Sequence, residues 1–217
     1  FILLTIASLS DETNRYRNTM DLLWFPTGGG KTEAYLALIA YISFYRRLKE
    51  PDNPDNGAGV VSIMRYTLRL LTTQQFSRAS AMILACEAIR LGKAEIKPSK
   101  SLGQIPFSIG LWVGGSATPN NFQDFIKKKI PPSSTPDQLQ FCPACKTRLK
   151  WWNDKHAQNR QVTCPNTKCI LYAGPKAPLP IYTIDTTLYQ KRPTLVISTV
   201  DKFATITRRA EIDHFFS

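Results

Sequence analysis

The residues with the most evident chemistry form a loop of three glycines bounded by a threonine and a lysine: Thr27, Gly28, Gly29, Gly30, Lys31 and Thr32. Glycines allow a tight turn whose backbone N–H groups converge on an anion, and a helix that follows adds its positive end. Lys31 can reach the β- and γ-phosphates of a nucleotide, and Thr32 can bind Mg²⁺. This pattern predicts a site for ATP and Mg²⁺, in which Lys31 and Thr32 are the candidate catalytic residues. The alternative is a glycine-rich turn with a chance lysine.

A second set of reactive residues consists of four cysteines in two pairs, with eighteen residues between the pairs: Cys142, Cys145, Cys164 and Cys169. Four thiolates in two short turns suit tetrahedral Zn²⁺, and a segment this short has too little core to fold unaided. Two disulfides are the rival reading, but a cytosolic nucleotide-binding protein keeps its thiols reduced. The sequence therefore predicts a Cys₄ zinc site. His156 is a spare ligand candidate that is better explained as a surface histidine, and Cys86 is expected to be an inert core cysteine.

The same segment is rich in cations and tryptophans, among them Lys146, Arg148, Lys150, Trp151, Trp152, Lys155 and Arg160. Such residues can neutralise phosphates and stack on bases, as in proteins that bind single-stranded nucleic acid. The tryptophans can equally pack the small core around the metal. Both interpretations remain open from the sequence.

The elements that must position these residues alternate between strands and helices. Short apolar runs predict strands at 21–25, 60–64, 107–113 and 194–198, and helical spacing predicts helices at 32–48, 68–91, 121–129 and from residue 201 onward. This alternation indicates an α/β fold with a parallel sheet and right-handed crossovers. The apolar residues 1–9 are expected to form a buried helix.

Composition divides the chain into three parts. A run of lysines, prolines and serines at 127–136 and a proline-rich stretch at 175–180 look like linkers around the cysteine segment. We therefore expect one α/β domain in two segments, 1–130 and 181–217, interrupted by a zinc-binding insertion at 131–180. The formal charge of +12 and the pI near 9.6 favour a polyanionic partner such as nucleic acid. No run of about 18 apolar residues occurs, so no membrane contact is expected.

Several motifs resemble those of superfamily 2 helicases. The loop at 27–32 fits the motif I form T-G-x-G-K-T, although Phe25 stands where a strict phosphate-binding loop has its first glycine. The positions that resemble motifs Ia, Ib and Ic are Thr67, Arg69, Gln74, Gly114, Gly115, Thr199 and Lys202. Hydroxyls, glycine N–H groups and helix N-termini at the ends of parallel strands can face phosphates along one edge of a sheet. The resemblance therefore implies a nucleic-acid track with little sequence preference.

Nearly the whole chain resembles the first RecA-like domain of such a helicase, with a phosphate-binding P-loop and a zinc insertion. Within the superfamily, the strings at 25–35 and 64–71 are most similar to the large helicase subunit of DISARM antiphage systems. This resemblance implies a bacterial, cytoplasmic, DNA-dependent ATPase that works with a partner subunit in defence against phage. It also implies single-stranded DNA or a strand junction as the nucleic acid that is bound.

The motif II carboxylates and the second RecA-like domain of such helicases are absent from these 217 residues. The stretch at 211–214 contains the letters of motif II in the wrong order. We therefore expect the chain to be part of a larger helicase and to be inactive alone. Two alternatives remain: a non-catalytic nucleic-acid scaffold with a zinc module and a structural nucleotide site, and a P-loop enzyme of another class, such as a kinase.

Overall fold

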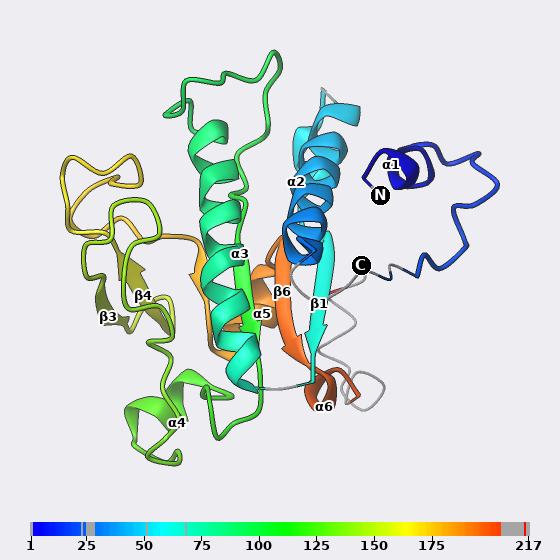
Figure 1. Cartoon of the computed structure of the whole chain (residues 1–217). Helices are drawn as coiled ribbons and strands as arrows, with labels where there is room; N and C mark the ends of the chain where they lie inside the picture. Colours follow the sequence, from blue (N-terminus) through cyan, green and yellow to red (C-terminus); the bar gives the residue numbers. More distant parts are fainter. Residues whose placement is uncertain are drawn as a thin grey trace.

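Four parallel strands form the central sheet of the computed structural model, which describes residues 2–22, 24, 29–50, 52–67, 69–204 and 215, without the side chains of residues 54 and 69–73. In spatial order the strands are β1 (Ser62–Tyr66), β6 (Leu195–Thr199), β2 (Ile109–Trp112) and β5 (Ile181–Tyr182). Each neighbouring pair runs in the same direction (Figure 1). The predicted α/β fold with a parallel sheet is therefore confirmed.

Strand β6 lies between β1 and β2, and all five of its residues are buried. Its run of leucine and β-branched residues suits a strand that is covered on both faces. Leu195 and Ile197 pack into the core on one face of the sheet, whereas Val196 packs with Trp112 and Leu188 on the other. The alternation along this one strand builds the two halves of the core.

Helices cover both faces of the sheet. Their bounds are α1 (Ile2–Ser10), α2 (Lys31–Lys49), α3 (Arg69–Arg90), α4 (Phe122–Ile126), α5 (Asp185–Lys191) and α6 (Val200–Phe203), with a short 3₁₀ helix η1 (Pro54–Gly57). Helices α2 and α3 cover one face (Figure 1), where Ile39, Phe76 and Ile83 are buried in a common core. Helix α5 covers the other face, and its Leu188 and Tyr189 belong to the second core cluster.

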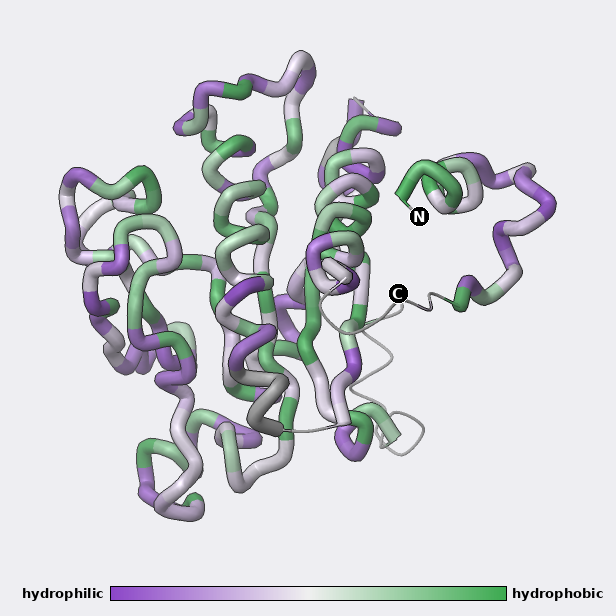
Figure 2. Tube along the Cα trace, viewed as in Figure 1, coloured by the Kyte–Doolittle hydropathy of each residue, from purple (hydrophilic) through white to green (hydrophobic). Residues whose placement is uncertain are grey.

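The segment at 1–9 forms the predicted helix α1, but its expected burial is wrong. Leu3 and Leu4 are 87% and 84% exposed, and Figure 2 shows this hydrophobic stretch at the side of the molecule. The helix contacts the flank of α2, where the Tyr45 hydroxyl donates a hydrogen bond to the Ser10 carbonyl at 2.6 Å. The apolar composition of this segment predicted a buried helix, but no described residues cover Leu3 and Leu4. Neither α1 nor any other described helix has the length and apolar character that a membrane span requires.

The strand expected at 21–25 is absent from the described part of that range. Residues 21, 22 and 24 belong to no strand. The side chains of Met20, Leu22 and Trp24 are between 85% and 89% exposed. Residues 23 and 25–28 lie outside the described residues. An apolar run becomes a strand only beside a partner that takes its backbone hydrogen bonds, and no described strand lies next to this segment.

A separate antiparallel hairpin, β3 (Lys150–Asp154) and β4 (Asn159–Thr163), lies in the cysteine-bearing segment. The Trp151 Nε1 group donates a hydrogen bond to the Leu139 carbonyl at 3.0 Å, and the Trp151 ring packs against the buried core. Arg160 forms an ion pair with Asp137 at 2.7 Å. These contacts tie the hairpin to the preceding chain, so Trp151 fulfils the packing role.

Candidate metal centre and strand-end site

The four cysteines Cys142, Cys145, Cys164 and Cys169 converge, and their Sγ atoms all lie within 4.8 Å of one another. The Cys142 and Cys169 sulfurs are 3.7 Å apart, and the Cys145 and Cys164 sulfurs are 3.5 Å apart. A tetrahedral zinc ion with Zn–S bonds of about 2.3 Å holds its sulfurs about 3.8 Å apart, whereas a disulfide brings them to about 2.05 Å. The cluster therefore fits one metal ion, such as zinc, and argues against two disulfides.

Hydrogen bonds donated by backbone N–H groups form the turn around each cysteine pair. The Cys142 N–H donates to the Thr147 carbonyl at 2.8 Å, and the Lys146 N–H donates to the Cys142 carbonyl at 2.9 Å. Lys146 has a left-handed φ of 61°, which closes the first turn. In the second turn the Leu171 N–H donates to the Cys169 Sγ at 3.4 Å. The wider spacing of the second pair therefore does not open the cluster.

Burial opposes ionisation of these thiols. Cys164 is 0% exposed, and burial raises the pKa of the Cys164 and Cys169 thiols. Burial also acts to raise the pKa of Cys145, but hydrogen bonds, of which those with Thr147 are the largest, outweigh it and lower the pKa to about 6. Because metals bind the thiolate form, metal binding must displace protons from the buried sulfurs.

His156 and Cys86 lie apart from the cluster. Within the described residues, the cluster includes no further histidine, cysteine or carboxylate. His156 is exposed on the turn between β3 and β4, as expected for a surface histidine. Cys86 is 4% exposed and its Sγ lies 3.7 Å from the Met82 Sδ. Burial raises the pKa of Cys86 to about 12, which agrees with an inert core cysteine.

Of the predicted nucleotide loop, the structure describes Gly29, Gly30, Lys31 and Thr32, whereas Thr27 and Gly28 lie outside the described residues. Helix α2 begins at Lys31, and Gly30 before it has a φ of 74°, a left-handed conformation that favours glycine. As the N-cap residue, Gly30 has no side chain to accept from the first N–H groups of the helix. These groups are the donors that an anion can engage.

The carboxyl ends of the parallel strands β1, β6 and β2 lie side by side at one end of the sheet, here called the sheet edge (Figure 1). Predicted nucleic-acid residues lie at this edge. Tyr66 pairs in register with Thr199, and Trp112 pairs with Ser198. Thr67 follows β1 directly, and the two predicted glycines begin two residues after β2. The parallel register thus places three motif positions from distant parts of the sequence at the same edge.

The side chains at this edge differ in exposure. Thr67 and Gly114 are exposed, and Thr199 is 9% exposed. Gln74 is exposed near the start of α3, whereas the side chain of Arg69 lies outside the described residues. A Cβ atom added at Gly115 would lie 3.2 Å from the Asn120 amide, so the loop after β2 is tightly folded there.

Lys202 lies within this edge and not on its surface. It is 8% exposed, and its Nζ is 2.5 Å from an Asp185 carboxylate oxygen and 3.3 Å from the Asn120 Oδ1. The Trp112 ring lies 6.0 Å from the same Nζ. The contact joins α6, α5 and the loop after β2. Asp185 is 1% exposed and was missed in the sequence, where an aspartate at the start of a helix indicates only a favourable helix dipole.

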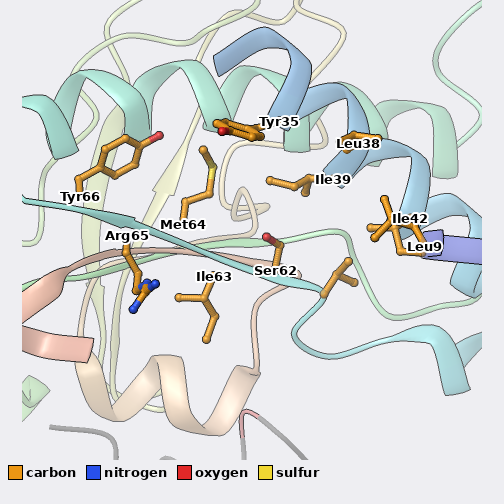
Figure 3. A pocket seen from close by; sticks show the side chains of 11 residues that line it. Leu9, Tyr35, Leu38, Ile39, Ile42, Ser62, Ile63, Met64, Arg65 and Tyr66 are labelled. Carbon is orange, nitrogen blue, oxygen red and sulfur yellow. The ribbon is translucent and has the colours of Figure 1, made fainter. Parts of the chain in front are cut away.

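A cavity of about 430 Å³ lies between β1 and α2 (Figure 3). Leu38, Ile39 and Ile42 of α2 and Met64 of β1 form apolar walls. The eleven lining residues include no carboxylate and no histidine, and Arg65 is the one lysine or arginine among them. The cavity is therefore mainly apolar, with Tyr35 and Tyr66 as its phenol groups, and the site residues predicted from the sequence are not among those that line it.

Similarity to known proteins indicates the kind of biological system in which these sites occur. No protein-family model matches the chain. The chain is similar to the DISARM protein DrmA of Bacillus paralicheniformis, with 38% identity over 222 residues. The similarity covers 94% of this chain but 19% of the relative, so the chain spans less than a fifth of the relative's length. This match supports a DISARM-like relation for the sequence.

Proposed function

We propose that the chain is the ATP-binding half of a superfamily 2 DNA helicase or translocase that acts in a DISARM-like antiphage defence system. The observation that carries the proposal is the meeting of Thr67, Gly114 and Thr199 at one edge of a parallel sheet. Helix α2, which starts with Lys31 and Thr32 after the N-cap Gly30, packs on the same sheet. The similarity to a DISARM protein supports the defence setting.

In this proposal the segments 1–130 and 181–217 form a RecA-like P-loop domain. Lys31 would hold the β- and γ-phosphates of ATP, and Thr32 would hold Mg²⁺. The N–H groups of residues 27–30 would complete the cradle. The left-handed Gly30 at the uncapped start of α2 supports this assignment, because such a turn leaves backbone donors for an anion. ATP supplies the free energy of hydrolysis that a translocase converts into movement.

The sheet edge would follow the nucleic-acid backbone. We assign phosphate contacts to Thr67, Arg69, Gln74, the glycines at 114–115 and Thr199. Lys202 would act through Asp185 and Asn120, to which it is bonded, by setting the spacing between the loops that follow β2 and β6. Hydroxyl and backbone donors read phosphates and not base edges, so single-stranded DNA or a strand junction would bind with little sequence preference.

Zinc is the metal that we propose for the cysteine cluster. Four thiolates occupy all four positions of a tetrahedral site and leave none open for a substrate, which is typical of a structural site. The ion would therefore fix the insertion at 131–180 and take no part in hydrolysis. The two turns and the β3–β4 hairpin would depend on it for their folding.

Hydrolysis would require groups that this chain does not contain. A water-orienting residue, a carboxylate for Mg²⁺ and charge stabilisation from a second domain are the usual components. We therefore assign turnover to the intact protein, in the bacterial cytoplasm and together with a partner subunit. The two domains would close and open alternately on a DNA strand, so that their phosphate contacts release and re-form further along it. The different DNA affinities of the closed and open states would drive each step.

Removing hydroxyls at the sheet edge of the full-length protein tests this function. Thr67→Val and Thr199→Val should each raise about tenfold the DNA concentration that half-stimulates ATP hydrolysis, because each loses a hydrogen bond to a charged phosphate. Basal hydrolysis should stay unchanged. Thr13→Val, at an exposed site beyond α1, is the control. Equal half-stimulating concentrations in all three variants would refute the proposed track.

A non-catalytic nucleic-acid scaffold is the second candidate. It is favoured by the cysteine cluster, whose four thiolates leave no open metal position for a substrate and suit a binding module. Under this alternative the full-length protein would bind DNA and would not hydrolyse ATP, and substitution of Lys31 would change neither property.

A further inference from the structure

Three consecutive lysines, Lys127, Lys128 and Lys129, follow helix α4 and carry exposed side chains. Within the described part of the chain, none of them takes part in an ion pair. The run places three positive charges at consecutive positions, and the proposed phosphate contacts do not use it.

Contacts with the cysteine-bearing segment hold α4 in place. A five-residue helix is too short to be stable alone. Its N-cap is Asn121, whose Oδ1 accepts from the Asp124 N–H at 2.7 Å, and Phe122 is 3% exposed. The Arg160 guanidinium of β4 lies 5.9 Å from the centre of the Phe125 ring. The lysines therefore follow a fixed element and do not lie in a free linker.

The backbone at the end of α4 shows that a lysine occupies an unfavourable position. Lys128 has a φ of 53°, in the left-handed region. Its N–H donates to the Phe125 carbonyl at 3.1 Å, and the Lys129 N–H donates to the Asp124 carbonyl at 2.8 Å. This pattern is a Schellman motif, whose left-handed position is usually glycine. A lysine at this position costs backbone strain that a glycine would avoid. The strained lysine points to a use for its charge.

The run lies at the same end of the molecule as the proposed track. Figure 1 shows α4 at the same end of the molecule as α6 and the start of α3. The chain that follows the lysines returns to the loop after β2, where the Ser133 hydroxyl donates to the Ser116 carbonyl at 2.8 Å. The Thr135 N–H also donates to the Ala117 carbonyl at 2.9 Å. These two hydrogen bonds connect the chain after the lysine run to the loop that contains Gly114 and Gly115.

We propose that Lys127, Lys128 and Lys129 extend the strand-end track by binding backbone phosphates of single-stranded nucleic acid beyond the Gly114–Gly115 loop. This inference rests on the proposed function. Ammonium groups bind phosphate as point charges and tolerate any base sequence, which agrees with a track that does not read bases. The cysteine cluster would thereby act on nucleic-acid binding indirectly, since its segment holds α4.

The first test is the salt dependence of binding of labelled oligothymidine to the full-length protein. Lys127→Gln/Lys129→Gln should lower the magnitude of the slope of log affinity against log salt by about 0.7 for each lost phosphate contact. Lys97→Gln/Lys100→Gln is the matched control, because both lysines are exposed in the loop after α3 at the opposite end of the sheet. Equal slopes for the two double variants would overturn the inference.

Lys128→Gly separates a binding role from a structural one. Glycine relieves the left-handed backbone, so the melting temperature should rise or stay constant, while the salt slope should still fall by about 0.7. A higher melting temperature with unchanged DNA binding would overturn the inference and leave Lys128 a cap residue. If the wild-type protein binds no oligothymidine, both this inference and the proposed function fail. If Thr199→Val weakens binding and the lysine variants do not, the inference alone fails.

Discussion

The cysteine-bearing segment and the glycine-rich segment are both short and chemically specialised, yet contacts within the chain define them to different degrees. Around Cys142 and Cys169 backbone hydrogen bonds close each turn, and the sulfurs stand at metal-binding distances. Before Gly30, in contrast, Met20 and Trp24 expose apolar side chains to solvent. A ligand site closed by local contacts can be specified by a short stretch of chain, whereas a phosphate loop depends on the strand and sheet that hold it.

The largest expected effect concerns the cysteine-bearing segment. Cys164→Ser should abolish metal binding and destabilise the protein by about 5 kcal/mol or more, because a structural metal contributes its binding free energy to folding. Metal content by mass spectrometry and denaturant unfolding measure the two effects. Cys86→Ala is the control and should keep the metal while costing about 1–2 kcal/mol for a small cavity. Full metal content in Cys164→Ser would show that Cys164 is not a ligand of the metal.

The buried ion pair at the sheet edge should come next. Lys202→Met leaves the carboxylate of Asp185, which is 1% exposed, without its cation, so we expect a loss of about 3–5 kcal/mol in unfolding free energy. Combining it with Asp185→Leu should recover most of that loss, since an apolar pair removes the unpaired charge. A loss below about 1 kcal/mol for Lys202→Met would mean that the loops are joined by other contacts.

A smaller effect is expected where the cysteine-bearing segment meets the sheet edge. Asn121→Ala removes the N-cap of α4 and should cost about 1 kcal/mol, with faster amide exchange in residues 122–129. Asn18→Ala, at an exposed position, should stay within about 0.5 kcal/mol of the wild type. If both variants behave alike, α4 does not depend on its cap.

The smallest effect should be found on α1. Leu3→Gln/Leu4→Gln should change the stability of the 217-residue polypeptide by less than about 0.5 kcal/mol, because these side chains are 87% and 84% exposed. Thermal unfolding of the purified polypeptide would measure it. A loss above about 1 kcal/mol would show that α1 is buried in solution, and the contrast between the two regions would then be weaker than the structure indicates.

The sequence predicted the features that depend on neighbouring residues, namely the strands and the cysteine ligands. It did not predict the features that depend on contacts between distant parts of the chain. Apolar runs located β1, β2 and β6 to within about two residues. Strands β2 and β6 are buried along their whole length, as parallel strands covered on both faces are, whereas β1 is only partly buried. The spacing of the cysteines identified a complete ligand set. The predictions of a strand at 21–25 and of a buried α1 were wrong. Apolar composition favours burial, but a strand also needs a neighbouring strand, and a helix needs a surface that covers its apolar face. The Lys202–Asp185 pair was missed, since it depends on how β6 and α5 lie across the sheet.

The most direct test of the central claim is ATP hydrolysis by the full-length protein with and without single-stranded DNA, comparing the wild type with Lys31→Ala. Lys49→Ala is the control, because Lys49 is exposed at the other end of the same helix and pairs with Glu12. We predict DNA-stimulated hydrolysis that falls by roughly a hundredfold or more in Lys31→Ala, since a positioned cation stabilises the transferring phosphoryl group, and that persists in Lys49→Ala. Turnover near the wild-type rate in Lys31→Ala would contradict the assignment of this loop as the ATP site.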